Sequence, residues 1–594
     1  MSEACSAVHL PSPQPGGDRG EPLAGGRWVG AILAAMGPGW GWRRWPAGAG
    51  GPGGLSGRPT GAGPAFAAAV LVTGCIGGLA ADAGGGSPSG AGSPSRGRGP
   101  AVSATVLSVT VRAATAGTAV VNESTPGALS VGVSRALLDA TPVVVVADAG
   151  DRSGIVTAAA QAERLSVPLL LDERASRSST RASSLSALSP SSPDASSPGA
   201  LLAEIRRLRP QAVLAVGSAV AARLGTTPGV RVVTDPTALP ETRPLPRRAD
   251  LVVLVRTGGD GATRAGTAAA SATARAAGAS VVPVRGGDPR ADPSAIATLT
   301  KRPPRRVLAA GAGFGLADLL AARVAVAATG TQLPGGGQVV FPGRRLVALY
   351  GHPGAAALGV LGEQGPAASI ARARAVAAPY RSLSRVPVVP AFEIITTVAT
   401  GTPGSDGNYS FESSVASLRP WVEGAGAAGM YVVLDLQPGR SDFLSQAKLY
   451  APLLRLPYVG LALDPEWRLA PGQRPLQQIG GVTAQEINTV SAWLARLTAA
   501  EHLPQKLLVL HQFRLSMIRD PRALDTRHDE LAMIVHMDGQ GPPSSKDDTW
   551  RTVTAAAPSG VPFGWKNFYD EDEPTLTPRQ TMSKRPIPVM ISYQ

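Results

Sequence analysis

The sequence is poor in cysteine and in aromatic residues. Its 594 residues include two cysteines, Cys5 and Cys75, so neither a disulfide nor a cysteine metal site can form beyond residue 75. Aromatic residues make up 4% of the chain, and the domains must therefore be held together mainly by aliphatic packing. A chain of this length exceeds what one hydrophobic core supports, which predicts two or three domains.

Acidic residues are also fewer than basic ones, 42 against 56. Residues 101–340 hold 25 basic and 16 acidic residues, whereas residues 341–594 are nearly balanced with 24 and 22. A basic middle region favours an anionic partner such as a cell-wall polymer or glycan. An arginine-rich solvated surface explains the surplus equally well. Nucleic acid is not an expected partner, because basic and aromatic residues do not interleave in the last 250 residues.

The N-terminal hundred residues read as an export segment. Residues 1–63 are rich in Gly, Pro and Trp and predict disorder or a misplaced start, and an apolar segment follows over 64–81. That segment contains Val72-Thr73-Gly74-Cys75, which resembles the bacterial lipobox and makes Cys75 the predicted lipidation site. Residues 82–103 form a Gly/Ser/Pro tether. We expect an exported protein, anchored by its N-terminal lipid to the outer face of the cytoplasmic membrane or the cell wall. A plain signal peptide or an uncleaved anchor is the alternative.

Residues 104–330 contain an internal repeat of apolar strands and alanine-rich helices. The first copy begins near Pro142 and the second near Asp250, and continuous apolar strands of this kind indicate parallel α/β units. The Gly/Asp turns and the run Leu208 to Gly217 resemble the cell-wall-binding repeat 2 family. That resemblance implies tandem Rossmann-like repeats that attach to anionic wall polymer. A generic Rossmann-like pair without wall affinity is the alternative. Residues 331–343 read as a linker.

Residues 344–594 predict a (β/α)8 TIM-like barrel. Eight apolar runs alternate with helical patterns, one of which spans Thr483 to Ala499 with Thr483 and Glu486 as a capping box. The expected strands are 346–350, 386–392, 430–435, 458–463, 506–511, 531–536, 561–566 and 587–593. The expected fold class is therefore α/β, with tandem Rossmann-like repeats followed by the barrel.

Polar side chains stand at the end of most of these strands. Because the carboxyl ends of barrel strands share one rim, their side chains are the candidate site. Those expected to bind a ligand are His352, Glu393, Gln437, Trp467, His511, Gln512, His536, Trp565, Lys566 and Tyr593. Those expected to be catalytic are Glu466, Asp464, Asp435 and Asp538. No cofactor or metal is predicted, although His536 and Asp538 lie close enough in sequence to share one ion.

Asp464 and Glu466 give the strongest of these signals. Two neighbouring carboxylates repel each other, which raises one pKa and supplies a general acid. The Asp-Pro-Glu ending of the fourth strand resembles that of chitinase-like and lysozyme-like barrel glycosidases, which implies Glu466 as the acid and Asp464 as its support. The longer acidic motif of chitinases is missing, and Lys566 stands where many glycosidases carry a nucleophile. The base or nucleophile would then be Asp435, Asp538 or a group of the substrate itself.

Two functions fit these patterns. The first is a glycosidase-like enzyme that cleaves a cell-envelope glycan. The second is a noncatalytic wall-binding protein whose barrel rim only recognises a polymer.

Overall fold

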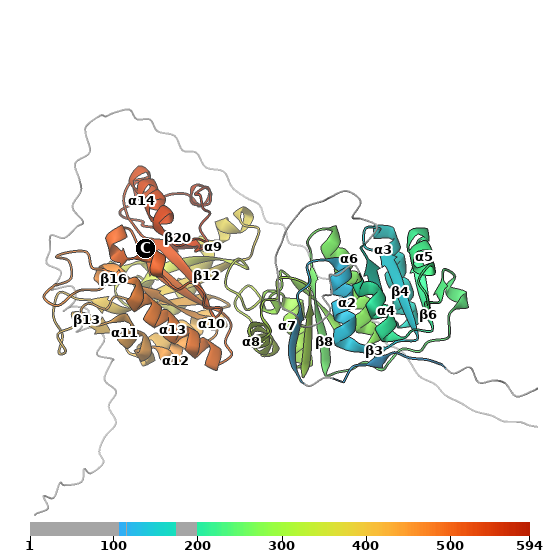
Figure 1. Ribbon diagram of the computed structural model, residues 1–594. Coiled ribbons are helices and arrows are strands. Elements are labelled where there is room, and N and C mark those ends of the chain that lie inside the picture. The colour runs from blue at the N-terminus through green and yellow to red at the C-terminus, as the bar shows by residue number, and fades with distance from the viewer. Residues whose placement is uncertain (1–105, 114–115, 174–198) are drawn as a thin grey trace, which may run out of the picture. The chain divides into compact units, whose positions relative to one another are not determined.

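The computed structural model describes residues 106–113, 116–173 and 199–594 (Figure 1). The predicted export segment, the lipobox with Cys75 and the tether lie outside these residues. Within the described residues, no helix combines the length and the apolar character that crossing a bilayer requires.

The first four-stranded sheet is parallel and is built around a fully buried central strand. Its order is β5-β4-β6-β7, with β4 paired to both β5 and β6. The side chains of Val143 to Val146 have no exposed surface, as expected for a parallel strand covered on both faces. The strands are β4 (Val143–Asp148), β5 (Leu169–Asp172), β6 (Ala212–Val216) and β7 (Val232–Val233). The neighbouring helices and short strands are α2 (Pro126–Leu137), α3 (Arg152–Leu165), α4 (Ala200–Leu208), α5 (Ser218–Gly225), β1 (Thr110–Val111) and β3 (Leu138–Ala140).

The second four-stranded sheet is also parallel. Its order is β2-β10-β8-β9, and β2 precedes the first sheet in the sequence. The strands are β2 (Gly117–Val121), β8 (Leu251–Thr257), β9 (Ser280–Arg285) and β10 (Arg306–Ala310), and the helices that follow the last three are α6 (Gly261–Ala276), α7 (Pro293–Lys301) and α8 (Ala317–Ala328).

Aspartates begin the helix that follows the central strand of each sheet. The Asp151 carboxylate accepts a hydrogen bond from the Gly154 amide at the start of α3, and Asp260 accepts one from Thr263 at the start of α6. An N-cap side chain satisfies an amide that the helix leaves unpaired. The Gly/Asp turns seen in the sequence are therefore helix caps.

The C-terminal region is a closed barrel of eight parallel strands, which confirms the predicted TIM-like fold. Pairing of β11 with both β12 and β21 closes the ring, and the short β13 joins β12 antiparallel on the outside. The strands are β11 (Arg345–Gly351), β12 (Val388–Ala399), β14 (Tyr431–Leu436), β15 (Val459–Leu463), β17 (Lys506–His511), β19 (Leu531–Met537), β20 (Phe563–Asn567) and β21 (Met590–Tyr593), with β13 (Ser410–Glu412) at the edge.

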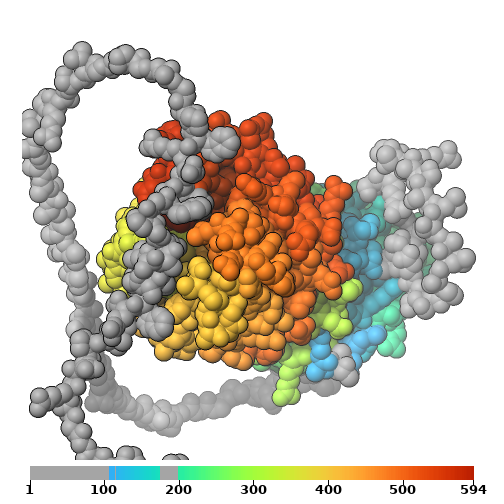
Figure 2. All heavy atoms as spheres, turned by 90° about the vertical axis from the view of Figure 1, so that its left-hand side faces the viewer, coloured from blue at the N-terminus to red at the C-terminus, as the bar shows by residue number. Residues whose placement is uncertain are grey.

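Helices and short turns connect the barrel strands, and residues of the barrel region form the yellow to red surface in Figure 2. The helices are α9 (Pro366–Ala377), α10 (Val415–Ala427), α11 (Phe443–Leu449), α12 (Ala451–Leu454), α13 (Ala484–Ala500), α14 (Pro543–Ala556) and α15 (Pro578–Thr581). A short β16–β18 ladder (Val482–Thr483 with Ile518–Arg519) lies among the connections. The 3-10 helices are η2 (Pro236–Ala238), η3 (Pro289–Ala291), η4 (Ala356–Leu358), η5 (Val360–Gly362), η6 (Ala378–Leu383), η7 (Pro465–Trp467), η8 (Leu515–Met517) and η9 (Pro521–Ala523).

Two local predictions need correction. The second strand runs to Ala399 instead of ending at 392, so Glu393 lies in the middle of β12 and not at its tip. The second concerns the capping box at α13. Thr483 does accept a hydrogen bond from the Glu486 amide, but the Glu486 carboxylate turns away to pair with Arg468 at 2.8 Å. A charged partner across the fold is a stronger attraction than a backbone amide.

The barrel interior is apolar toward the amino ends of the strands and polar toward their carboxyl ends. Side chains alternate between the two faces of a strand, so every second residue points into the barrel. One buried cluster joins inward residues of seven strands: Leu346, Ala348, Val389, Ala391, Tyr431, Val433, Ala462, Leu507, Val509, Ile534 and Met590. This apolar plug fills the lower part of the barrel, and the next inward position on each strand supplies the site described below.

Candidate active site

All eight strands contribute a polar side chain to one layer above the apolar plug. The alternation that points Val433, Val509 and Ile534 inward also points the residue two positions later inward. That layer consists of Tyr350, Glu393, Asp435, Asp464, His511, His536, Lys566 and Ser592, and all of them are buried. Asp538 continues the same face of β19 and is also buried. So many buried ionisable groups are costly unless they pair with one another or with a ligand.

His511 is the central cation of this layer. Its Nδ1 lies 2.9 Å from an Asp538 oxygen, its Nε2 lies 3.0 Å from Glu393, and Asp435 is 3.9 Å from the same nitrogen. Burial alone would lower the pKa of His511, but the carboxylates of Glu393 and Asp538 raise it well above its usual value. Conversely, His511 lowers the pKa of both carboxyl groups against the effect of burial. The result is a fixed ion triad of Glu393, His511 and Asp538.

Asp435 and Tyr350 form a second connected pair. The Tyr350 hydroxyl donates to Asp435 at 2.8 Å, and Gln437 donates to the same hydroxyl at 3.4 Å. The Lys566 ammonium lies 3.3 Å from the centre of the Tyr350 ring, where the face of an aromatic ring attracts a cation. Burial raises the pKa of Asp435 to about 6, while His511 opposes the rise. Asp435 is therefore a stronger base than an ordinary aspartate.

Asp464 and Glu466 bracket Pro465 at the end of β15. Asp464 is buried and ends the strand, and Glu466 lies in η7 and is partly exposed. Burial, followed by the nearby Asp538 carboxylate, raises the pKa of Glu466 to about 8. Burial and the charge of Glu466 raise the pKa of Asp464 well above its usual value. Near neutral pH Glu466 is therefore mostly protonated, whereas Glu393 and Asp538, whose pKa values are lowered, are ionised.

Several polar atoms of this layer are buried without any hydrogen-bond partner. They are Glu393 Oε2, Asp435 Oδ1, Asp464 Oδ1, Asp538 Oδ1, Trp467 Nε1 and His536 Nδ1. A buried polar atom without a partner costs about 1–3 kcal/mol, and such atoms in a native protein are usually paired by water or a ligand. The four carboxyl oxygens come from four different strands. Together they favour a ligand that donates several hydrogen bonds.

The remaining predicted rim residues divide into two groups. The first group, His352, Gln512 and Gln437, lies just beyond the ends of the strands. His352 is hydrogen-bonded to the Ile395 carbonyl at 2.8 Å, and Gln512 donates to the Arg514 carbonyl at 3.2 Å. Gln437 accepts a hydrogen bond from the Ala399 amide. Trp565 and Tyr593 point the other way, which corrects their predicted place on the rim. Trp565 packs outside the barrel against Trp550, and the Tyr593 hydroxyl bonds Tyr380 in the outer layer. Because side chains alternate along a strand, Trp565 and Tyr593 point out of the barrel, whereas Lys566 and Ser592 point into it.

Tyr350 and Ser592 are members of the layer that the sequence reading missed. It took the end of the first strand as the functional position and passed over Tyr350, two residues before His352. The alternation along the strand could have identified Tyr350, because Leu346, Ala348 and Tyr350 point to the same side and the first two are apolar. Ser592 was passed over for Tyr593 for the same reason. Its hydroxyl lies 2.7 Å from His536 Nε2 and sets the orientation of that ring.

Other side chains of the barrel contact His511 and His536. Among the described residues, no cluster of three or more His, Cys, Asp or Glu side chains is arranged to hold an ion. The His536 ring contacts Ser592 on one side, and a Cβ atom added to Gly564 would lie 1.9 Å from its Nδ1 on the other. Burial lowers the pKa of His536 to about 3, so the ring is neutral. Asp538 is paired with His511 at 2.9 Å, so its carboxylate is already used by a partner other than His536.

Comparison with known proteins gives no relative from which a function can be carried over. No protein-family model matches the chain, and no curated protein matches its sequence. The resemblance of residues 104–330 to cell-wall-binding repeats therefore stays a prediction, and functional inference rests on the geometry of the site.

Proposed function

We propose that the barrel hydrolyses a glycosidic bond in a cell-envelope glycan, with Glu466 as the general acid. The observation that carries the proposal is the separation of the pKa values within one layer. Glu466 has a pKa raised to about 8 and Asp435 one raised to about 6, so near pH 7 the first holds a proton and the second has lost it. An acid and a base poised on opposite sides of neutrality are what glycoside hydrolysis needs.

The reaction then follows from these two protonation states. Glu466 gives its proton to the bridging oxygen as the bond from that oxygen to the sugar breaks. Asp435 takes a proton from water as the water oxygen forms the new bond to the sugar carbon. Asp435 suits this role better than Asp538, because the ion pair with His511 lowers the pKa of Asp538 and makes it a weaker base. Asp464, whose pKa is raised by burial and by Glu466, lies beside the acid and offers its unpaired Oδ1 to the ligand.

The ligand class follows from the unpaired atoms. Sugar hydroxyl groups are hydrogen-bond donors, and they match the unpaired oxygens of Glu393, Asp435 and Asp538. Trp467 lies beside the acids and supplies an aromatic surface and an N–H donor that lacks a partner.

For residues 104–330 we propose tandem Rossmann-like repeats that bind anionic wall polymer. The two sheets have the same internal order: β4 lies between β5 and β6, and β8 lies between β9 and β10, all parallel. The basic surplus of this region supports an anionic partner. Together with an N-terminal lipid on Cys75, this would hold the barrel at the outer face of the membrane, close to the wall.

The test of the catalytic proposal is Glu466→Gln, assayed by release of reducing ends from purified envelope glycan. The amide keeps the size of the side chain but cannot donate the proton, so we expect a loss of about 10²–10⁴-fold in rate. Glu501→Gln is the matched control, because Glu501 is an exposed glutamate paired with Arg455 on the surface. Unchanged hydrolysis by the Glu466 variant would remove Glu466 from the mechanism.

A noncatalytic role is the second candidate, and one observation favours it. Glu393, Asp435 and His511 have no exposed surface, as expected of a polar cluster that orders the barrel and recognises a ligand only at its edge. In that case the wild-type protein would bind purified envelope glycan without releasing reducing ends, and Glu466→Gln would change the affinity alone.

A further inference from the structure

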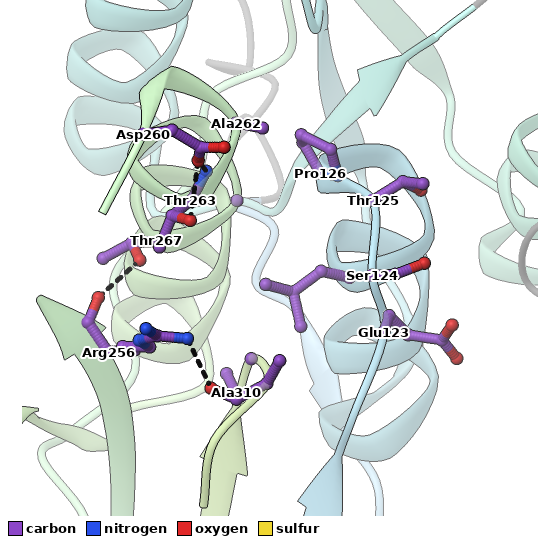
Figure 3. Close-up of a pocket in the computed structure, with 14 residues that line it drawn as sticks. Glu123, Ser124, Thr125, Pro126, Arg256, Asp260, Ala262, Thr263, Thr267 and Ala310 are labelled. Carbon is purple, nitrogen blue, oxygen red and sulfur yellow. Dashed lines mark hydrogen bonds between the residues drawn. The ribbon is translucent and has the colours of Figure 1, made fainter. Parts of the chain in front are cut away.

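A cavity in the α/β region lies at the carboxyl end of the second sheet. It is lined by residues that follow β2, β8 and β10 and by the first turns of α2 and α6, and it has a volume of about 100 Å³ (Figure 3). For scale, an apolar cavity of about 150 Å³ accommodates benzene. The space therefore suits a small ligand or one group of a larger ligand.

The place of the cavity in the fold is the usual ligand position of a parallel α/β sheet. From β8 the chain crosses to β9 on one side and then returns to β10 on the other side of β8. The strand order therefore reverses between β8 and β10. Ligands of open α/β sheets bind outside the carboxyl ends of the strands at such a reversal. Arg256 near the end of β8 and Gly311 just after β10 both line the cavity.

Arg256 is the cationic group in a lining that also includes Glu123 and Asp260, and neither carboxylate forms an ion pair with it. Its Nη1 donates to the Ala312 carbonyl at 3.2 Å, while its Nε is buried and has no hydrogen-bond partner. No carboxylate among the described residues forms an ion pair with it. In Figure 3 the guanidinium group points into the space between α6 and α2, and Glu123 points away from it. A guanidinium group without a counterion at a cavity calls for an anion.

The helix N-termini beside the cavity do not create the need for an anion. Asp260 occupies the first turn of α6 by accepting from the Thr263 amide, and Glu173 accepts from the Gly127 amide at the start of α2. The Asp260 side chain is exposed, so solvent screens its charge. Arg256 is therefore the group that selects the ligand.

The first sheet provides an internal comparison. β4 pairs with β6 from Val143 onward, and β8 pairs with β10 from Leu251 onward, so Asp148 occupies in β4 the position of Arg256 in β8. The Asp148 carboxylate is used locally, accepting from the Gly150 amide at 2.8 Å. Two sheets with the same strand order thus carry opposite charges at the equivalent position, and only the second suits an anion.

We propose that the cavity between β8 and β10 is a binding site for one phosphate group, held by Arg256. The planar guanidinium group carries its N–H donors in a fork, and this geometry matches two phosphate oxygens. Gly313 of the neighbouring loop has a φ of 99° and lies next to the guanidinium group, where a Cβ atom would come within 3.5 Å of Nη1. This site is independent of the chemistry of the barrel and of polymer binding elsewhere on the α/β region.

The test is a calorimetric titration of the full-length protein with inorganic phosphate, glycerol phosphate and a nucleoside monophosphate. We expect saturable binding of one phosphate per chain in the wild type, weakened at least about tenfold in Arg256→Gln. Arg302→Gln is the matched control, because Arg302 is exposed after α7, next to the amino ends of the strands. The control should bind as the wild type does.

Three outcomes would overturn the proposal: no saturable phosphate binding, two sites per chain, or equal affinity in Arg256→Gln. Arg256→Lys serves if the glutamine variant does not fold, since it keeps the charge and loses the planar pair of donors, and we expect an intermediate affinity. Among the three ligands, the tightest identifies the source of the phosphate group: free phosphate, a small phosphate ester, or a nucleotide. Loss of phosphate binding with unchanged glycan hydrolysis would leave the barrel proposal intact.

Discussion

Lys506 provides a test of the buried electrostatics that does not depend on function. It begins β17, has no exposed surface, and donates to the carbonyls of Leu456 at 2.8 Å and Val459 at 2.9 Å. No carboxylate among the described residues pairs with it. Two acceptors match the two N–H groups of a neutral amine, whereas an ammonium group would keep a third N–H unpaired. Burial accordingly lowers the pKa of Lys506 to about 7.

This shift makes stability depend on pH with a definite sign. Between pH 7 and about 10.4 the unfolded lysine binds a proton that the folded one does not, so the free energy of unfolding rises with pH. A fully developed difference changes by 1.36 kcal/mol per pH unit. With a folded pKa of about 7, the contribution of Lys506 grows by about 2 kcal/mol from pH 7 to pH 9.

The assay is urea unfolding of the wild type and of Lys506→Met at pH 7, 8 and 9. Methionine removes the titrating group and keeps the length of the side chain. We expect the stability difference, wild type minus variant, to grow by about 2 kcal/mol over this range. Lys448→Met, at an exposed lysine of α11, should show no such trend. A wild-type-minus-variant difference that stays flat with pH would show that Lys506 is charged in the folded protein.

Two further predictions concern the barrel site. If Asp435 acts as base and Glu466 as acid, hydrolysis of envelope glycan should follow a bell-shaped pH profile: activity rises as Asp435 ionises near pH 6 and falls as Glu466 ionises near pH 8. A profile with no alkaline limb would contradict the role of Glu466. Gly564→Ala should destabilise the barrel by about 3 kcal/mol in thermal or urea unfolding, because the new Cβ would lie 1.9 Å from a His536 ring that Ser592 already fixes. Gly424→Ala, in the helix α10 where the nearest atom is 3.8 Å away, should cause no loss.

Much of the fold could be read from local patterns. Runs such as Val143 to Ala147 are apolar throughout, and a strand covered on both faces needs that pattern. The eight barrel strands were predicted for the same reason, and Asp435 near the end of β14 and Asp464 just after β15 lie where the sequence put them. The prediction for β12 was too short, because no glycine or proline marks its end near Glu393 and the added pairing with β13 extends it.

Tertiary structure decided which side chains point into the barrel and which point out of it. Trp565 and Lys566 are neighbours in the sequence, yet one packs against Trp550 outside the barrel and the other lies over Tyr350 inside it. Reading the rim as a set of strand tips could not separate them. The residue two positions after an inward-pointing apolar residue also points inward, and this rule separates Trp565 from Lys566. It can be applied only when the residues that point inward on each strand are already known.

The sequence by itself determined the alternation of strands and helices, the helix caps at Asp151 and Asp260, and the presence of acids near strand ends, because each of these depends on neighbours within a few residues. Only the tertiary structure decided which charges meet. Glu393 and His511 are 118 residues apart in the chain, and ring closure brings them to 3.0 Å. The protonation states that give Glu466 and Asp435 their proposed roles arise from burial and from these long-range pairs, and neither has a signature in the local sequence.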